Sequence, residues 1–311
     1  MARPRWYKPD RGLGFRMVVV MVLLAALYMA FILVLQSLGV TFYLLVLIVG
    51  IMLVAQFFFS DRMVLAATGA REVTPQQAPQ LHRIVERLAQ QADIPKPKVA
   101  LIATDMPNAL ATGRDPQHAV VAVTEGLMRR LEPEEVEAVI GHELTHVLNR
   151  DVAVITIASF FATVASFVVQ QFLWLGMMGG MGGMGGMGGR RGGRGGSGGM
   201  SPLILIWLVS MAVWAISFIL IRTLSRYREL AADRGSAMMT GRPSQLASAL
   251  IKISRDAQRI PDKDLRRMEP AAALFIIPAL SRQSLLQLIS THPSLKQRLA
   301  QLERLERDME R

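Results

Sequence analysis

Four long apolar segments, each free of charged residues, constrain this chain of 311 residues more than any other feature of its sequence. A helix needs about 20 apolar residues to cross a hydrocarbon core roughly 30 Å thick, and each segment is about that long. The predicted transmembrane helices are residues 17–37, 40–59, 152–175 and 202–221. We therefore expect a mainly α-helical integral membrane protein with two larger polar regions, residues 60–151 and 222–311.

The distribution of basic residues predicts the orientation of these helices. The N-terminal region, residues 1–16, carries five basic side chains: Arg3, Arg5, Lys8, Arg11 and Arg16. The hairpin between the first two helices carries none, so the positive-inside rule places the N-terminus in the cytoplasm. Three arginines in residues 176–201 oppose this orientation, but more arginines flank the helices on the assigned inside. Four spans then place both polar regions at the cytoplasmic face of a bacterial-type plasma (inner) membrane.

Residues 176–201 form a low-complexity segment of Gly-Gly-Met repeats followed by arginine, glycine and serine. Such a composition cannot build a packed core, so we predict a flexible, non-cytoplasmic loop. The alternative is a binding site for Cu(I), because the spaced methionines offer soft thioether ligands.

The formal charge of +11 raises the question of nucleic-acid binding. Most of the excess positive charge lies beside the membrane segments, where orientation and anionic lipid headgroups explain it. The chain has no Gly-Lys pair, which excludes a P-loop, and no cysteine, which excludes disulfides and thiolate metal ligands. We therefore expect the lipid bilayer as a partner, and neither nucleic acid nor nucleotide.

The first polar region shows the pattern of a small α+β domain. Helical periodicity extends over residues 75–93, and two apolar runs, residues 99–103 and 119–123, are typical of short strands. The segment NALATGRDPQ between them is predicted to be a loop or an edge strand. Glu132 and Pro133 then begin another helix, where proline suits the first turn.

That helix carries the sequence HELTH, with His142 and His146 four residues apart and therefore on one helical face. Two imidazoles so placed can bind one metal ion, and Glu143 between them can accept a proton from water. The alternative is a pair of unrelated surface histidines. The sequence leaves open whether this helix continues through Asn149–Asp151 into the third span or bends there.

A catalytic zinc site needs a third protein ligand and an open position. His82 and His118 are predicted to be surface residues, so carboxylates are better candidates. Glu229 and Asp233 follow the fourth span and lie four apart on one helical face. At about 1.5 Å per residue, the histidine pair and Glu229 stand at similar heights, roughly 10 and 12 Å beyond their spans.

Glu229 is therefore the predicted third ligand. Asp233, one turn further, is expected to accept the remaining N–H of a ligand histidine. The alternative is that both carboxylates pair with Arg226 or Arg234 as surface charges.

With HELTH at 142–146, ELAAD at 229–233 and four predicted spans, the chain resembles the HtpX-type membrane zinc metalloproteases. These are gluzincins related to the CAAX prenyl-protein endopeptidases. The resemblance implies one Zn²⁺ per chain bound by His142, His146 and Glu229, with Glu143 as the base. It also implies a cytoplasmic zincin-like protease domain with a small sheet, and a role with partners in membrane-protein quality control.

Two further segments match the family pattern. NALATG at 108–113 is similar to the family's NAFATG-type segment, which implies an edge strand that binds the substrate backbone. Its residues are Asn108, Ala109, Leu110, Ala111 and Thr112. THPSLKQR at 291–298 resembles a segment whose histidine and arginine assist catalysis, which implies roles for His292 and Arg298 in stabilising an oxyanion. The sequence also allows His292 to be an ordinary loop residue before Pro293.

The leading hypothesis is a zinc endopeptidase that hydrolyses membrane proteins or peptides near the cytoplasmic face. A transporter is disfavoured because the spans contain no charged residue. A zinc-stabilised, non-catalytic adaptor would not need Glu143 beside the metal. A zinc hydrolase of acyl or lipid substrates is the remaining alternative, and the predicted peptide-binding strand disfavours it.

Overall fold

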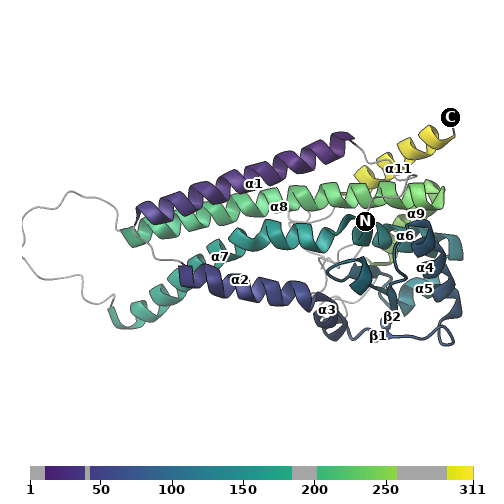
Figure 1. Cartoon of the computed structure of the whole chain (residues 1–311), viewed down its shortest axis with the longest axis horizontal. Helices are drawn as coiled ribbons and strands as arrows, with labels where there is room; N and C mark the ends of the chain where they lie inside the picture. Colours follow the sequence, from purple (N-terminus) through teal and green to yellow (C-terminus); the bar gives the residue numbers. More distant parts are fainter. Residues whose placement is uncertain (1–10, 39–42, 184–201, 258–292, 311) are drawn as a thin grey trace, which may run out of the picture. The chain divides into compact units, whose positions relative to one another are not determined.

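The computed structural model describes residues 11–38, 43–183, 202–257 and 293–310, and these form two compact units (Figure 1). The apolar unit contains the described parts of Val19–Leu53 and Ile157–Ile221. The polar unit contains Val54–Thr156 with the described parts of Met1–Val18 and Arg222–Arg311. Residues 1–10, most of the predicted Gly/Met loop and His292 lie outside the described residues.

Four apolar helices occupy the positions of the predicted spans: α1 (Arg11–Ser37), α2 (Tyr43–Phe58), α7 (Asp151–Gly183) and α8 (Pro202–Thr240). Among the described residues, two helices are long and apolar enough to span a membrane: Arg11–Ser37 and Ile204–Thr240. A third candidate is α7, which bends by 44° between Asp151–Phe160 and Ala162–Gln170. The count of four spans is therefore not confirmed. Helix α2 has 16 residues and is therefore only roughly 24 Å long. That length is less than the thickness of a hydrocarbon core, which is about 30 Å.

The apolar unit has the outer surface expected in lipid. Large apolar side chains such as Val22, Met52 and Ile219 are exposed, whereas Leu24 and Phe31 are buried. So many large apolar side chains exposed along helices are unusual for a soluble protein. The chain is thus an integral membrane protein. Helix α7 continues to Gly183, so it includes the first residues of the segment predicted as a loop.

The polar unit contains the predicted small sheet. Its strands are β1 (Arg71–Glu72), β2 (Lys98–Ile102), β3 (Ala109–Thr112) and β4 (Val120–Thr124), in the order β1-β2-β4-β3. Strands β2 and β4 are parallel and correspond to the two predicted apolar strands. Strand β3 pairs antiparallel with β4, with Ala109 opposite Val123. The segment NALAT therefore lies at one end of the described sheet, as an edge strand.

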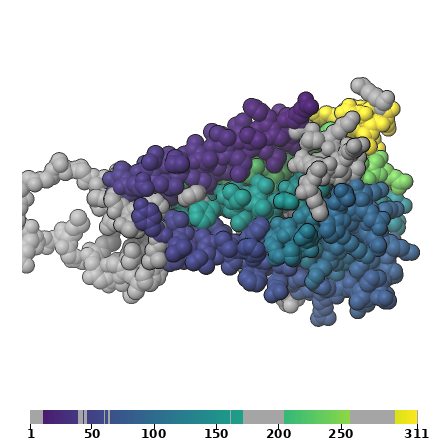
Figure 2. Space-filling model, in the orientation of Figure 1, coloured from purple at the N-terminus to yellow at the C-terminus, as the bar shows by residue number. Residues whose placement is uncertain are grey.

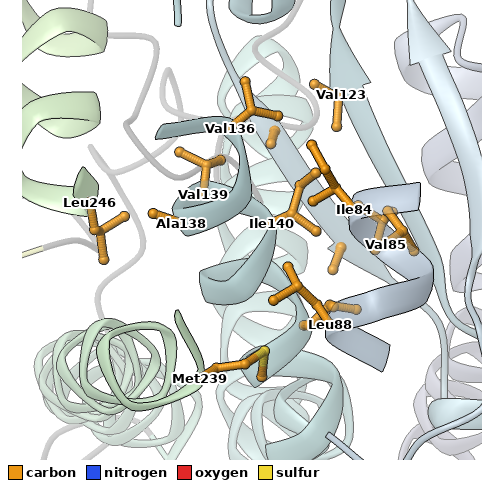
Figure 3. Packing of buried hydrophobic residues seen from close by; sticks show 14 of the residues in the cluster. Ile84, Val85, Leu88, Val123, Val136, Ala138, Val139, Ile140, Met239 and Leu246 are labelled. Carbon is orange, nitrogen blue, oxygen red and sulfur yellow. The ribbon is translucent and has the colours of Figure 1, made fainter. Parts of the chain in front are cut away.

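The helices of the polar unit are α3 (Ser60–Thr68), α4 (Pro79–Gln91), α5 (Glu125–Arg130), α6 (Pro133–Asn149), α9 (Pro243–Ala257) and α11 (Leu295–Met309). Helices α3, α4, α5 and α6 contact strands of the sheet, whereas α9 packs on α6 and on α11. Figure 3 shows Ile140 of α6 near Ile84 and Leu88 of α4, while Val139 lies on the side of α6 that faces Leu246 of α9. In Figure 2 the C-terminal α11, in yellow, lies beside α9, in green. The helix with the HELTH motif is thus at the centre of the polar unit's core.

Local sequence explains where α6 begins. Pro133 occupies its first turn, and Glu132 and Glu135 form a reciprocal capping box. Glu135 is buried, and its carboxylate also accepts hydrogen bonds from Ser248 Oγ at 2.6 Å and Lys252 Nζ at 2.8 Å. These contacts join the start of α6 to α9.

One predicted surface residue is buried. His82 in α4 is only 8% exposed, and its Nε2 lies 2.9 Å from the backbone oxygen of Val73. The prediction of a solvated face was wrong at this position because the chain before α4 folds back over the helix. His118 is exposed, as predicted, and its Nδ1 lies 2.7 Å from Asp115 Oδ1.

Candidate metal centre

Helix α6 brings the two motif histidines together. The Nε2 atoms of His142 and His146 are 3.2 Å apart, and His142 is fully buried. The two rings are nearly perpendicular, with centroids 4.8 Å apart. Because both Nε2 atoms point to one spot, the histidines are not unrelated surface residues.

Helix α8 adds a carboxylate at the same spot. Glu229 Oε1 lies 3.5 Å from His146 Nε2, and Oε2 lies 3.6 Å from His142 Nε2. Among the described residues, these three side chains form the group able to hold a metal ion, with ligand atoms within 4.8 Å of one another. The predicted meeting of the two motifs is therefore present in the polar unit.

The spacing of these atoms fits zinc. Zinc binds nitrogen and carboxylate oxygen at about 2.0–2.2 Å in tetrahedral geometry, so its ligand atoms lie about 3.4 Å apart. The two nitrogens are 3.2 Å apart, and each lies 3.5 or 3.6 Å from a different oxygen of Glu229, which is close to that value. Two nitrogens and one oxygen leave a fourth position open, as catalytic sites require.

Asp233 of α8 lies beside His142. Its Oδ1 is 2.9 Å from His142 Nδ1, so the opposite ring nitrogen faces the ligand cluster. Arg298 of α11 donates from Nε to Asp233 Oδ2 at 2.8 Å and from Nη2 to Oδ1 at 2.5 Å. All three side chains are buried. Arg298 thus binds Asp233 through two hydrogen bonds, and the sequence did not indicate this contact.

A second carboxylate contacts the other histidine, and sequence reasoning missed it. Asp151 Oδ2 lies 2.5 Å from His146 Nδ1, and Asp151 Oδ1 lies 3.0 Å from Arg228 Nε. Asp151 is buried although it begins an apolar helix. A lone acidic residue just before an apolar segment was the available signal.

Glu143 is also buried, beside the ligand cluster. Burial raises the pKa of its carboxyl, while the neighbouring histidines and a backbone hydrogen bond from Ala111 of β3 oppose that rise. Burial lowers the pKa of His142, but contacts with Asp233 and Glu229 outweigh it and raise the pKa to about 9. Glu143 is thus a buried candidate base. The carboxylates of Asp233 and Glu229 favour a positive charge at the neighbouring His142.

Strand β3 lies next to α6, and all four of its residues are buried. Leu110 packs in a small cluster with Ile102 and Met106, on the opposite side of the strand from Ala109 and Ala111. Asn108 Oδ1 accepts a hydrogen bond from the backbone N–H of Ala109 at 3.0 Å. The predicted substrate strand is therefore adjacent to Glu143, and the Leu110 side chain faces a core cluster.

Small residues allow α6 and α8 to approach each other closely. A Cβ atom added to Gly235 would lie 2.3 Å from Thr145 Cγ2. Ser236 Oγ donates to the backbone oxygen of Ala138 at 2.6 Å, and Gly141 faces the same serine. This close crossing sets the distance between the histidines and Glu229.

Gly235→Ala is expected to lower the free energy of unfolding by about 1–3 kcal/mol, because the added methyl group overpacks the α6–α8 contact. Chemical denaturation of the full chain in detergent measures the change, and zinc titration should show weaker binding. Gly14→Ala is the matched control, since a Cβ there meets nothing within 4 Å. Equal stability of Gly235→Ala and the wild type would contradict the packing argument.

Comparison with known proteins agrees with this geometry. Peptidase family M48 matches residues 75–306. A protease HtpX homolog of Moorella thermoacetica is 58% identical over 302 residues, 97% of each chain. A protease HtpX homolog 2 of Methanosarcina acetivorans is 52% identical over 305 residues, 98% of this chain and 99% of that one.

A solved structure shares the fold. The crystal structure of S. mikatae Ste24p aligns with a TM-score of 0.54 at 16% identity, covering 94% of this chain and 67% of that one. M48 peptidases depend on a metal, and the cluster of two histidines and one glutamate supplies ligands for one. On the evidence of motif, geometry and relatives, this chain belongs to peptidase family M48 and is a membrane metalloendopeptidase of the HtpX type.

Proposed function

We propose that this chain is a zinc-dependent endopeptidase that cleaves membrane proteins near the cytoplasmic face of a bacterial-type inner membrane, in membrane-protein quality control. The observation that carries the proposal is the group of His142, His146 and Glu229, whose atoms are spaced for tetrahedral zinc beside buried Glu143. The relatives' name, protease HtpX homolog, supports the reaction class.

In this proposal His142, His146 and Glu229 hold the ion. Zinc bound there would supply Lewis acidity, which polarises a scissile carbonyl and favours deprotonation of water near neutral pH. Glu143 takes the proton from the attacking water and passes it to the nitrogen of the leaving amine. Its burial and raised pKa suit both transfers, because the proton must be neither too weakly nor too strongly held.

The substrate backbone is proposed to lie along β3, residues 108–112. An extended peptide added to a sheet edge is held by main-chain hydrogen bonds, which suits cleavage of unfolded segments with varied side chains. Asp233 holds the tautomer of His142 that turns Nε2 to the metal, and Arg298 holds Asp233. Because of its contact with Asp233, we propose that Arg298 is a positioning residue, which orients His142 through Asp233. His292 stays a candidate for assisting catalysis.

The proposed location rests on the charge distribution. Five basic residues precede α1, and arginines such as Arg222, Arg226 and Arg228 follow the apolar part of α8. This asymmetry supports four spans, with residues 60–151 and 222–311 forming a cytoplasmic protease domain. Substrates in or near the bilayer are then within reach of the domain, and the proposed partners are membrane proteins and quality-control factors.

Removing the metal tests the function. Purified full-length protein treated with a chelator is expected to stop cleaving an unstructured test protein, because the bound ion is needed to polarise the scissile carbonyl. Stoichiometric Zn²⁺ should restore cleavage, whereas Mg²⁺ should not, because Mg²⁺ prefers six oxygen ligands. Fragments are detected by mass spectrometry. Undiminished cleavage by protein shown to be free of zinc would overturn the proposal.

A further inference from the structure

A single residue separates the motif helix from the apolar helix that follows it. Helix α6 ends at Asn149 and α7 begins at Asp151. Arg150 between them has φ 55° and ψ 43°, the left-handed conformation. Its N–H closes α6 on the backbone oxygens of His146 and Val147. For a residue other than glycine this conformation costs about 1–2 kcal/mol, so a compensating contact is expected.

The break determines where Asp151 points. In a continuous helix, each residue turns by about 100°, so residues five apart lie about 140° apart around the axis. Asp151 would then face away from His146. With Arg150 left-handed, Asp151 Oδ2 instead lies 2.5 Å from His146 Nδ1. The strained residue thus brings a carboxylate to a candidate metal ligand.

The other oxygen of Asp151 is held as well. Arg228, adjacent to Glu229 in α8, places Nε 3.0 Å from Asp151 Oδ1. Asp151 is 3% exposed, and a carboxylate that deeply buried needs a paired charge. Its two oxygens therefore contact one histidine of α6 and one arginine of α8.

The two histidines are supported in parallel ways. His142 contacts Asp233, which Arg298 holds, and His146 contacts Asp151, which Arg228 holds. Each contact is made at Nδ1, so both rings turn Nε2 toward Glu229. Carboxylates in this position fix the orientation of a ligand histidine and raise its basicity.

We propose that Asp151 is a positioning residue of the metal site, which aims His146 at the ion and is itself aimed by Arg150 and held by Arg228. This inference rests on the proposed metal-binding function of His142, His146 and Glu229. Asp151 is the first residue of α7, so its side chain links the start of that helix directly to the candidate metal ligand His146. Loss of Asp151 should free the His146 ring and weaken metal binding without removing a ligand.

Metal binding by the full-length chain in detergent tests the proposal. Asp151→Ala is expected to lower zinc affinity about 10–100-fold, measured by competition with a chromophoric chelator. The visible spectrum of the Co²⁺-loaded variant should also change, because the His146 ring is no longer fixed. Asp151→Asn should lose less affinity than alanine does, since its amide oxygen still accepts from Nδ1. Asp61→Ala, which changes an aspartate in the first turn of α3, is the matched control.

Arg150 variants test the break itself. Arg150→Gly should keep wild-type zinc affinity, because glycine adopts positive φ freely, whereas Arg150→Val should lose affinity because a β-branched residue resists positive φ.

Wild-type affinity and an unchanged Co²⁺ spectrum in Asp151→Ala would overturn the inference and leave the proposed function intact. Failure of the wild type to bind zinc would overturn both. If Asp151→Ala does not fold, Arg150→Val decides, and an unchanged zinc affinity and Co²⁺ spectrum in that variant count against the proposal.

Discussion

Glu143→Gln is expected to slow peptide hydrolysis by about 10²–10⁴-fold while zinc binding stays at the wild-type level. Glutamine has nearly the same shape and can still accept the hydrogen bond from the Ala111 backbone. It cannot take a proton from water at neutral pH, so the step that the carboxylate performs is lost. Because Glu143 is buried, bulk buffer cannot replace it efficiently.

The measurement is the initial rate of cleavage by zinc-loaded wild type and variant, with the zinc content of each determined. Glu134→Gln serves as the control, since Glu134 is exposed on the same helix. Its rate should match the wild type. A zinc-loaded Glu143→Gln protein that cleaves at the wild-type rate would remove Glu143 from the mechanism.

Arg298→Met is expected to cost about 3–5 kcal/mol of unfolding free energy, because it leaves the fully buried Asp233 carboxylate without its charge partner. Zinc affinity should fall at the same time, since an Asp233 that is no longer held cannot orient His142. Denaturation and zinc titration of the full chain measure both effects. Arg304→Met, on the exposed side of α11, should change neither.

Two further variants separate positioning from direct catalysis. Adding Asp233→Asn to Arg298→Met should recover part of the lost stability, because the buried charge is then removed together with its partner. Arg298→Lys should be intermediate, since lysine keeps the charge but not the two-point contact. If Arg298→Met kept wild-type stability and zinc affinity and lost only rate, Arg298 would act on the reacting groups, as the family resemblance implies.

Local periodicity explains what could be predicted about the site. His142 and His146 share a helical face at a spacing of four, and so do Glu229 and Asp233. These relations need only helix geometry. Their meeting was predictable because each motif adjoins an apolar segment, which places both near one membrane surface. The family motifs then indicated the role of each residue.

The roles of Asp151 and Arg298 were not predictable in this way. Asp151 reaches His146 only because Arg150 is left-handed, and an arginine carries no signal for that conformation. Arg298 contacts Asp233 from 65 residues away in the sequence. A contact of that range depends on how α11 packs against the unit, which no local pattern records.

The sequence by itself determined the class of this protein: apolar segments require a membrane, and HELTH with ELAAD requires helices that display metal ligands. Both follow from short-range rules of hydrophobicity and helical spacing. Only the tertiary structure decided which side chains orient those ligands and how closely α6 approaches α8. Those features arise where helices cross, at Gly235 and at the paired carboxylates and arginines, and burial there makes each contact depend on the whole fold.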